Sequence, residues 1–283
     1  MKQKNLIISF ILILVILTTL TFVLMFKNIS QGSYDAWGGL MMWIPAISAL
    51  ITSLIHKDSL KNYGWKPGKM KYLAYSYLVP LLIGIVVYGV AWLFGIIEFY
   101  GDEASNYKWV KMLGIETPAP ALVGVVSKLI LGSILISILT LGEEIGWSGF
   151  LIPKLLKITS IPVTSIVVGI IWAMWHYPAI IGGIYGYGTP LPLTLIAFTL
   201  VLIGNSLFTT YFVSKSKSLW PGVIIHTSHN VFIMGILFDL TVKSKYAAYF
   251  VSESGIITAI IYVIGAILFY RFQVKRQLIK NEA

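Results

Sequence analysis

Eight long apolar stretches constrain the fold of this chain more than any other feature. They cover residues 6–26, 37–55, 72–97, 121–153, 160–180, 191–213, 220–238 and 255–270. A helix needs about 20 apolar residues to cross the hydrocarbon core of a bilayer. Because lipid offers no hydrogen-bond partners, such segments must satisfy their backbone groups internally, as helices do. The sequence therefore predicts an all-α, polytopic membrane protein with about eight transmembrane helices.

The composition excludes a soluble globular protein. Of the 283 residues, 57% are hydrophobic and only 11% are charged, which is too little polar surface to cover a globule. The absence of cysteine excludes disulfides, thiolate metal sites and a cysteine nucleophile. The sequence contains no soluble domain, linker or internal repeat, so residues 1–283 are predicted to form a single integral membrane domain.

The net charge of +10 is distributed as in membrane proteins. Counted from a cytoplasmic N-terminus, the inner segments hold 15 Lys and Arg residues and the outer segments hold 5. The positive-inside rule therefore predicts that both termini are cytoplasmic. The basic residues fall between apolar stretches, so we predict the lipid bilayer as a partner and no nucleic acid. The excess of lysine over arginine indicates an AT-rich genome, which favours a bacterial source and therefore a bacterial plasma membrane.

Most acidic residues are predicted to be solvated loop charges. These residues are Asp35, Asp58, Glu98, Asp102, Glu103, Glu116, Glu253 and Glu282.

One basic residue, Lys128, lies inside an apolar stretch. It is near the end of that stretch, so its side chain can reach the membrane interface.

Two adjacent carboxylates, Glu143 and Glu144, lie within an apolar stretch instead. An ionised acid at membrane depth costs about 3 kcal/mol, so something must offset that cost. One structural interpretation is a loop that places both acids in water. Another is close helix packing at Gly142, Gly146 and Gly149, with the acids satisfied by neighbours. The third interpretation is function, which is the usual reason for ionisable groups in a membrane.

Three of the four histidines also lie within or beside apolar stretches. His176 ends one apolar run, and His226 begins a polar run in a later one. His229 either joins the face of His226 or bonds a backbone carbonyl. The remaining histidine, His56, borders a basic loop and is predicted to decorate the interface.

Helical spacing predicts which of these groups converge. His226 and Asn230 are four residues apart and share a face, as do Glu144 and Ser148. Glu143 and Glu144 point about 100° apart on a helix. One of them can therefore face a reaction centre while the other orients a partner.

Glutamate, imidazole and amide side chains in a sheltered site are suited to activating water. A carboxylate can act as general base, histidine can relay the proton, and histidine with asparagine can hold the developing oxyanion. The same glutamates and histidines could instead ligate a divalent metal such as zinc, which would activate a bound water. Both chemistries stay open, although the H-E-x-x-H arrangement is absent.

Three motifs, in this order, resemble those of the CAAX protease and bacteriocin-processing (CPBP) family of intramembrane peptidases. That family includes the type II CAAX prenyl endopeptidases and the bacterial abortive-infection proteins. The resemblance covers roughly residues 120–240. The matching motifs are Glu143-Glu144 followed by Gly146-Trp147-x-Gly149-Phe150, then Trp172-x-x-x-His176 with Trp175 and Pro178, then Trp220-Pro221 and His226-x-x-x-Asn230.

The resemblance implies an eight-helix fold with the active site inside the membrane. In such a site Glu143, next to Glu144, activates water with help from His176, while His226 and Asn230 form the oxyanion hole. The implied function is an endopeptidase that cuts a membrane-associated peptide or small membrane protein. The resemblance suggests a role in immunity or in the processing of prenylated proteins, pheromones or bacteriocins. The family has been described both as metalloproteases and as metal-independent glutamate proteases, and we favour the latter.

Ser148 departs from the family pattern, which often has arginine at this position. That arginine would lie one helical turn from Glu144, so Glu144 lacks its usual partner. We predict that Glu144 is neutral or that it bonds Ser148, Trp147 or a histidine instead. The departure keeps open a catalytically inactive immunity or scaffold protein. A proton-coupled transporter is a further alternative, but the chain lacks the repeat symmetry of many transporters.

A depth calculation predicts a difficulty for this site. At 1.5 Å per residue, a straight helix that begins near Ile161 places His176 about 22 Å from the inner surface, and His226 lies only about 9 Å deep. Helices perpendicular to the membrane would keep the two apart, so a helix must tilt or begin outside the hydrocarbon. We expect a cavity that faces the cytoplasm.

Overall fold

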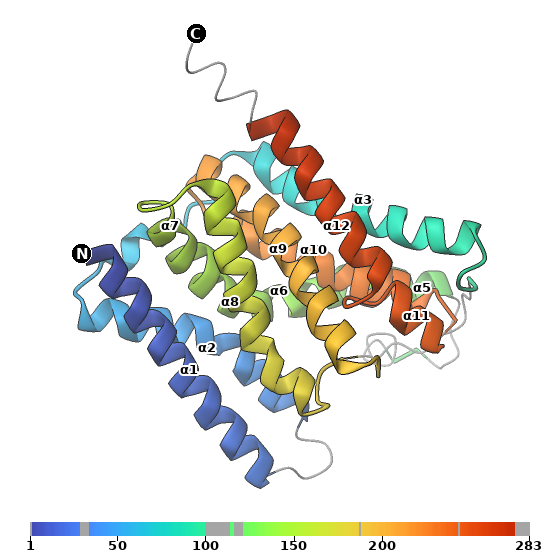
Figure 1. Ribbon diagram of the computed structural model, residues 1–283, viewed down its shortest axis with the longest axis horizontal. Coiled ribbons are helices and arrows are strands. Elements are labelled where there is room, and N and C mark those ends of the chain that lie inside the picture. The colour runs from blue at the N-terminus through green and yellow to red at the C-terminus, as the bar shows by residue number, and fades with distance from the viewer. Residues whose placement is uncertain are drawn as a thin grey trace.

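The structure is a computed structural model that describes residues 2–28, 34–99, 114–115, 121–186, 188–242 and 244–274. Within these residues the backbone is helical almost throughout, apart from an antiparallel bridge between Phe99 and Thr241 (Figure 1). The α-helices are α1 Lys2–Asn28, α2 Tyr34–Ile55, α3 Met70–Leu93, α5 Ala121–Ser127, α6 Ser133–Glu144, α7 Ile152–Leu155, α8 Ile161–Ile181, α9 Leu191–Ser216, α10 Trp220–Val231, α11 Lys245–Phe250 and α12 Ile256–Phe269. A 3₁₀ turn, η1 Leu60–Tyr63, and the π-helical segments η3 Lys128–Gly132, η4 Ile145–Leu151, η5 Phe232–Leu237 and η6 Tyr270–Val274 complete the described elements.

Seven helical segments of the described chain are long and apolar enough to cross a membrane. They are Lys2–Phe26, Trp37–Ile55, Met70–Leu93, Leu122–Leu155, Ile161–Ile181, Leu191–Ser216 and Ile256–Gln273. These segments correspond to seven of the eight predicted stretches, and the all-α polytopic class is confirmed. The eighth stretch, 220–238, forms α10 and η5 but is not among the seven. Its apolar character is reduced by the polar residues His226, His229 and Asn230.

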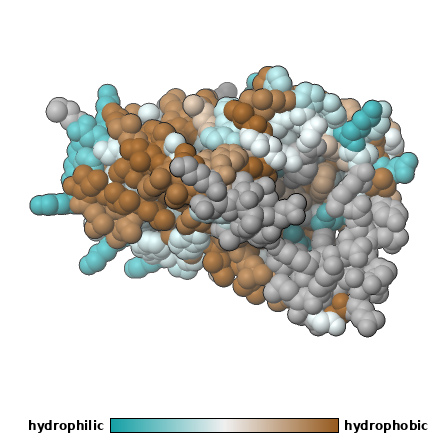
Figure 2. All heavy atoms as spheres, turned by 90° about the horizontal axis from the view of Figure 1, so that it is seen from below, coloured by the Kyte–Doolittle hydropathy of each residue, from teal (hydrophilic) through white to brown (hydrophobic). Residues whose placement is uncertain are grey.

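The outer helices present apolar side chains to their surroundings, as lipid contact requires. Ile8, Leu12, Val15, Ile16 and Leu20 are all exposed on α1. Figure 2 shows brown, apolar side chains over much of one face, with teal side chains projecting mainly at the ends. In contrast, α10 lies inside the bundle, where it packs against α3, α6 and α9 (Figure 1).

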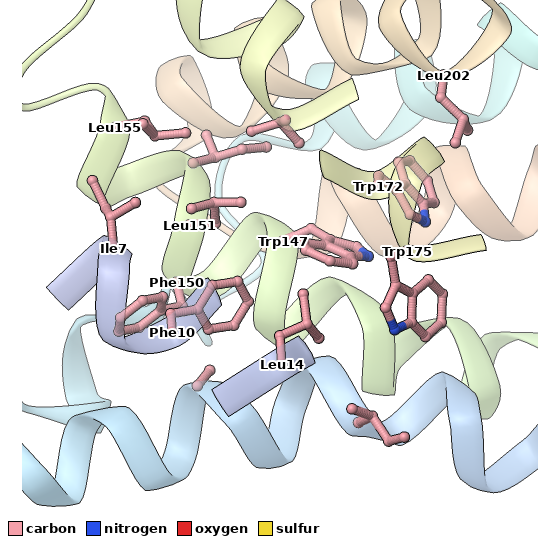
Figure 3. Packing of buried hydrophobic residues seen from close by; sticks show 14 of the residues in the cluster. Ile7, Phe10, Leu14, Trp147, Phe150, Leu151, Leu155, Trp172, Trp175 and Leu202 are labelled. Carbon is pink, nitrogen blue, oxygen red and sulfur yellow. The ribbon is translucent and has the colours of Figure 1, made fainter. Parts of the chain in front are cut away.

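Trp147, on η4, lies at the centre of the largest apolar cluster. Its ring centroid lies 5.9 Å from that of Phe10 on α1, 6.3 Å from Trp172 and 6.0 Å from Trp175, both on α8 (Figure 3). Phe150, one helical turn further along, stacks against Phe10 as well (Figure 3). This packing fixes the end of α6, which carries the two predicted glutamates, against α1 and α8.

Small residues let α6 and η4 approach α2 closely. A Cβ atom added to Gly142 would lie 2.7 Å from the Met42 carbonyl oxygen, and one added to Gly146 would lie 2.5 Å from Pro45 Cβ. The close-packing interpretation of these glycines is therefore confirmed. The alternative, a loop in water, is wrong because residues 133–151 are continuously helical and both glutamates are buried.

One of the predicted solvated acids is instead part of a buried ion pair. Asp58 pairs with Lys154 of α7, and their side chains are only 12% and 6% exposed. The prediction failed because η4 and α7 fold back beside the segment that follows α2. Glu98 is exposed as predicted. The side chains of Asp35, Asp102, Glu103, Glu116 and Glu282 lie outside the described residues.

Candidate active site

The predicted site residues gather around one cavity of about 590 Å³. Its lining includes Glu143 from the end of α6, His176 from α8, and His226 and Asn230 from α10. Glu144 does not line the cavity but contacts His226 from behind. Most of the remaining lining residues are apolar or aromatic.

Glu143 is held at the cavity wall by two indole groups. Its side chain is almost fully buried, at 2% exposed. Trp172 Nε1 donates to Glu143 Oε2 at 2.8 Å, and Trp147 Nε1 donates to the same oxygen at 3.3 Å. Neutral N–H donors fix a carboxylate without cancelling its charge, so Glu143 keeps the ability to accept a proton.

Glu144 points to different partners, as the spacing of adjacent helical residues predicted. Ser148 Oγ donates to Glu144 Oε2, and His226 Nδ1 lies 3.1 Å from Glu144 Oε1. The prediction that Glu144 bonds Ser148 or a histidine is confirmed. Gly222 leaves the space for this contact, because a Cβ atom there would lie 2.5 Å from Glu144 Oε2. Ser148 therefore stands where the family often has arginine, and it donates the hydrogen bond that the Glu144 carboxylate needs.

The depth calculation overestimated the separation of His176 and His226. The His226 ring packs edge-on against Trp172, with centroids 4.9 Å apart. Trp172 lies one turn before His176 on α8, a step of about 6 Å along the helix. The two helices are therefore offset along their axes, and His176 and His226 line the same cavity.

His176 is oriented by its own helix and by aromatic neighbours. Its Nδ1 lies 3.0 Å from the Trp172 carbonyl oxygen. The ring packs against Trp175, Tyr185 and Phe198 at centroid distances of 4.7, 5.4 and 5.1 Å. A carbonyl can only accept, so Nδ1 carries a proton and donates it to this carbonyl.

A second polar cluster, which sequence analysis missed, lies in the wall of the same cavity. Glu253 is only 5% exposed and lines the cavity, so its assignment as a solvated loop charge was wrong. Tyr185 Oη donates to Glu253 Oε2, and His229 Nε2 lies 3.3 Å from Glu253 Oε1. His229 Nδ1 lies 2.7 Å from Tyr262 Oη, so His229 lines the cavity and bonds side chains rather than a carbonyl.

The environment of Glu253 keeps this carboxyl ionised. The residue lies in the turn between α11 and α12, outside the spanning segments. Burial raises the pKa of the Glu253 carboxyl, but contacts with His229 and Tyr185 and the proximity of His176 outweigh it. The pKa of Glu253 is therefore lower than its ordinary value.

Two further polar residues line the cavity. Lys128 is half-buried and its side chain faces the cavity, rather than reaching only towards the interface. Asn205, in the middle of α9, is 2% exposed, and its Oδ1 has no hydrogen-bond partner among the described residues. An amide side chain inside an apolar stretch also indicates a candidate functional site. Asn205 was missed because the sequence analysis considered mainly ionisable groups. The local sequence around Glu253 gave no such signal, because its partners come from distant segments.

The described residues do not form a metal site. No group of three or more His, Cys, Asp or Glu side chains among them is arranged to hold a metal ion. Glu143 is instead bonded by indoles, and His226 by Glu144.

Comparison with known families agrees with the geometry. Residues 123–232 match a family profile described as type II CAAX prenyl endopeptidase Rce1-like. This region includes Glu143, Glu144, His176, His226 and Asn230, but not Glu253. A search of curated proteins gives no significant match. The chain is therefore an integral membrane protein, and its residues 123–232 are similar to the Rce1-like type II CAAX prenyl endopeptidases.

Proposed function

We propose that this protein is an intramembrane endopeptidase in which Glu143 activates a water molecule. The observation that carries the proposal is the position of Glu143, a buried carboxylate oriented by two indoles in a cavity that it shares with His176, His226 and Asn230. Both indole hydrogen bonds end at Oε2. Glu143 Oε1 is then the oxygen that would accept a proton from water.

The proposed reaction is hydrolysis of a peptide bond by direct attack of water. Glu143 takes a proton as the water oxygen bonds to the carbonyl carbon. The proton passes to the leaving amine through Glu143 or through the lone pair of His176 Nε2 as the carbon–nitrogen bond breaks. The products are a carboxylic acid and an amine, with no covalent enzyme intermediate.

His226 and Asn230 are proposed to hold the oxyanion that forms on the carbonyl oxygen. In the imidazolium form, His226 donates one proton to Glu144 through Nδ1 and offers the second through Nε2. Asn230 lies one turn further on the same helix and can add an amide N–H. Glu144 is thus a positioning residue that acts through His226, with Ser148 holding its other oxygen.

The proposed substrate is a membrane-associated peptide or a small membrane protein. The cavity wall is mostly apolar, which suits a segment entering from lipid. Processing of a peptide pheromone or bacteriocin, or a role in immunity, fits this substrate class, with both termini placed in the cytoplasm of a bacterial cell. The alternative of an inactive scaffold rested on the missing arginine. Ser148 hydrogen-bonds Glu144 in its place, so this reason for proposing an inactive protein no longer applies.

The test compares the membrane peptides of cells that express the wild type, Glu143→Gln or His176→Ala. Loss of a general base typically lowers the rate by about 10²–10⁴-fold. We therefore expect cleavage products that are present with the wild type and absent with both variants. His56→Ala, which changes an imidazole outside the cavity, is the matched control and should retain the products. Identical products from the wild type and Glu143→Gln would reject the peptidase.

A further inference from the structure

Three segments that are distant in sequence build a second polar cluster beside the proposed catalytic residues. Tyr185 comes from the α8–α9 loop, His229 from α10, and Glu253 from the α11–α12 turn. Tyr185 Oη donates to Glu253 Oε2, and His229 Nε2 lies at ion-pair distance, 3.3 Å, from Glu253 Oε1. The contacts of Glu253 have no role in the proposed activation of water, because Glu143 is held by Trp147 and Trp172 instead.

Glu253 supplies a carboxylate to the wall of the cavity. One of its oxygens accepts from Tyr185, and the other lies 3.3 Å from His229 Nε2 without a hydrogen bond. His229 Nδ1 lies 2.7 Å from Tyr262 Oη. Because each carboxylate oxygen can accept more than one hydrogen bond, Glu253 keeps acceptor capacity for a group inside the cavity.

Charge-assisted hydrogen bonds stabilise a buried carboxylate, and the cavity offers space for a further donor. Asn205 presents a second unmet acceptor in the same cavity, because its buried Oδ1 has no partner within the described chain. An aliphatic group would leave both acceptors unmatched, and an anionic group would be repelled by Glu253. A cationic hydrogen-bond donor would satisfy both.

We propose that Glu253 and Asn205 form a subsite that binds a basic side chain of the substrate, a lysine ammonium or an arginine guanidinium. This inference rests on the proposed peptidase function and adds a specificity to it. The Tyr185 ring lies 5.4 Å from the His176 ring. An extended peptide advances about 3.3–3.6 Å per residue. The basic residue therefore lies within about two residues of the cleaved bond.

The experiment uses the full-length protein in liposomes and pairs of internally quenched peptides with an apolar anchor. Each pair differs only by lysine or norleucine at one position within two residues of the cleaved bond, which mass spectrometry maps. Norleucine keeps the aliphatic chain and lacks the ammonium group. A charge-assisted hydrogen bond in a buried site predicts that the wild type prefers lysine by about tenfold or more in kcat/KM at one position.

The variant Glu253→Gln should reduce this preference to about one, whereas Glu98→Gln, which removes an exposed carboxylate, should keep it. Asn205→Leu should reduce the preference by a smaller factor, which tests the subsite a second time if Glu253→Gln folds poorly. A binding measurement on Glu143→Gln should show the same lysine preference in Kd without turnover.

The outcomes separate the subsite from the peptidase. If Glu143-dependent cleavage occurs with equal rates for lysine and norleucine at every position, the subsite is rejected and the peptidase stands. If Glu253→Gln lowers both rates equally and keeps their ratio, Glu253 only positions neighbouring groups and the subsite is again rejected. If no peptide is cleaved, the peptidase fails, and equal Kd values for the two peptides would then reject the subsite independently.

Discussion

Replacing Gly222 with alanine tests whether the contact between α10 and the second glutamate controls the site. The new Cβ atom would lie 2.5 Å from Glu144 Oε2, 2.8 Å from Ser148 Cβ and closer still to Ser148 Oγ. Non-bonded atoms rest about 3.5–4.0 Å apart, so α10 or the Glu144 carboxylate must move by about 1 Å. Such a shift lengthens the 3.1 Å contact between Glu144 Oε1 and His226 Nδ1 beyond hydrogen-bond range.

The expected effects of Gly222→Ala follow from this displacement. Overpacking a filled core costs about 1–3 kcal/mol of unfolding free energy. Loss of an oriented oxyanion donor lowers kcat by about 10²–10³-fold. Because His226 is proposed to act in the transition state, kcat and kcat/KM should fall together while KM changes little.

The assay measures peptide cleavage in liposomes and thermal unfolding in detergent for the same preparations. Gly89→Ala is the matched control, since a Cβ atom at this position on α3 meets no atom within 4 Å. A destabilised Gly222→Ala protein with wild-type kcat would refute the positioning of His226 by Glu144. A variant that matches the wild type in both stability and kcat would refute the close packing itself.

Three further predictions concern stability and metal dependence. Lys154→Met leaves Asp58 buried without its partner and should lower the unfolding free energy by about 3–5 kcal/mol, measured by denaturant titration, whereas the exposed Lys157→Met should not. Gly169→Ala places a Cβ atom 2.6 Å from Ile203 Cα, a backbone atom that cannot rotate away, so α8 and α9 should separate and thermal unfolding should show a loss of about 1–3 kcal/mol. Dialysis against a chelator should leave peptidase activity unchanged, because Glu143 is proposed to activate water directly; activity that is lost and then restored by zinc would contradict this.

The fold was largely predictable because membrane insertion is a local property of the sequence. Apolar length alone identified seven segments that the structure shows as helices long enough to span. The stretch 220–238 was harder to classify, since its polar residues serve the interior of the bundle rather than lipid. Orientation in the membrane stays a prediction from the distribution of lysines.

The candidate site was predictable where its residues lie close in sequence. Helical spacing alone predicted that Glu143 and Glu144 diverge and that Glu144 meets Ser148, because such contacts depend only on the geometry of one helix. The depth of His176 relative to His226 was not predictable, since it depends on how two helices are offset. The same limit applies to Asp58, whose partner Lys154 lies on a segment that folds back towards it.

The sequence by itself determined that the chain is helical, lies in a membrane and carries carboxylate and imidazole groups where lipid would otherwise exclude them. Only the tertiary structure decided which of these groups share a cavity. Glu253 illustrates the difference: its own neighbours in sequence suggest a solvated turn, yet Tyr185 and His229 enclose it within the bundle. The physical reason is that the ionisation and accessibility of a carboxylate depend on partners from distant segments, which local sequence does not specify.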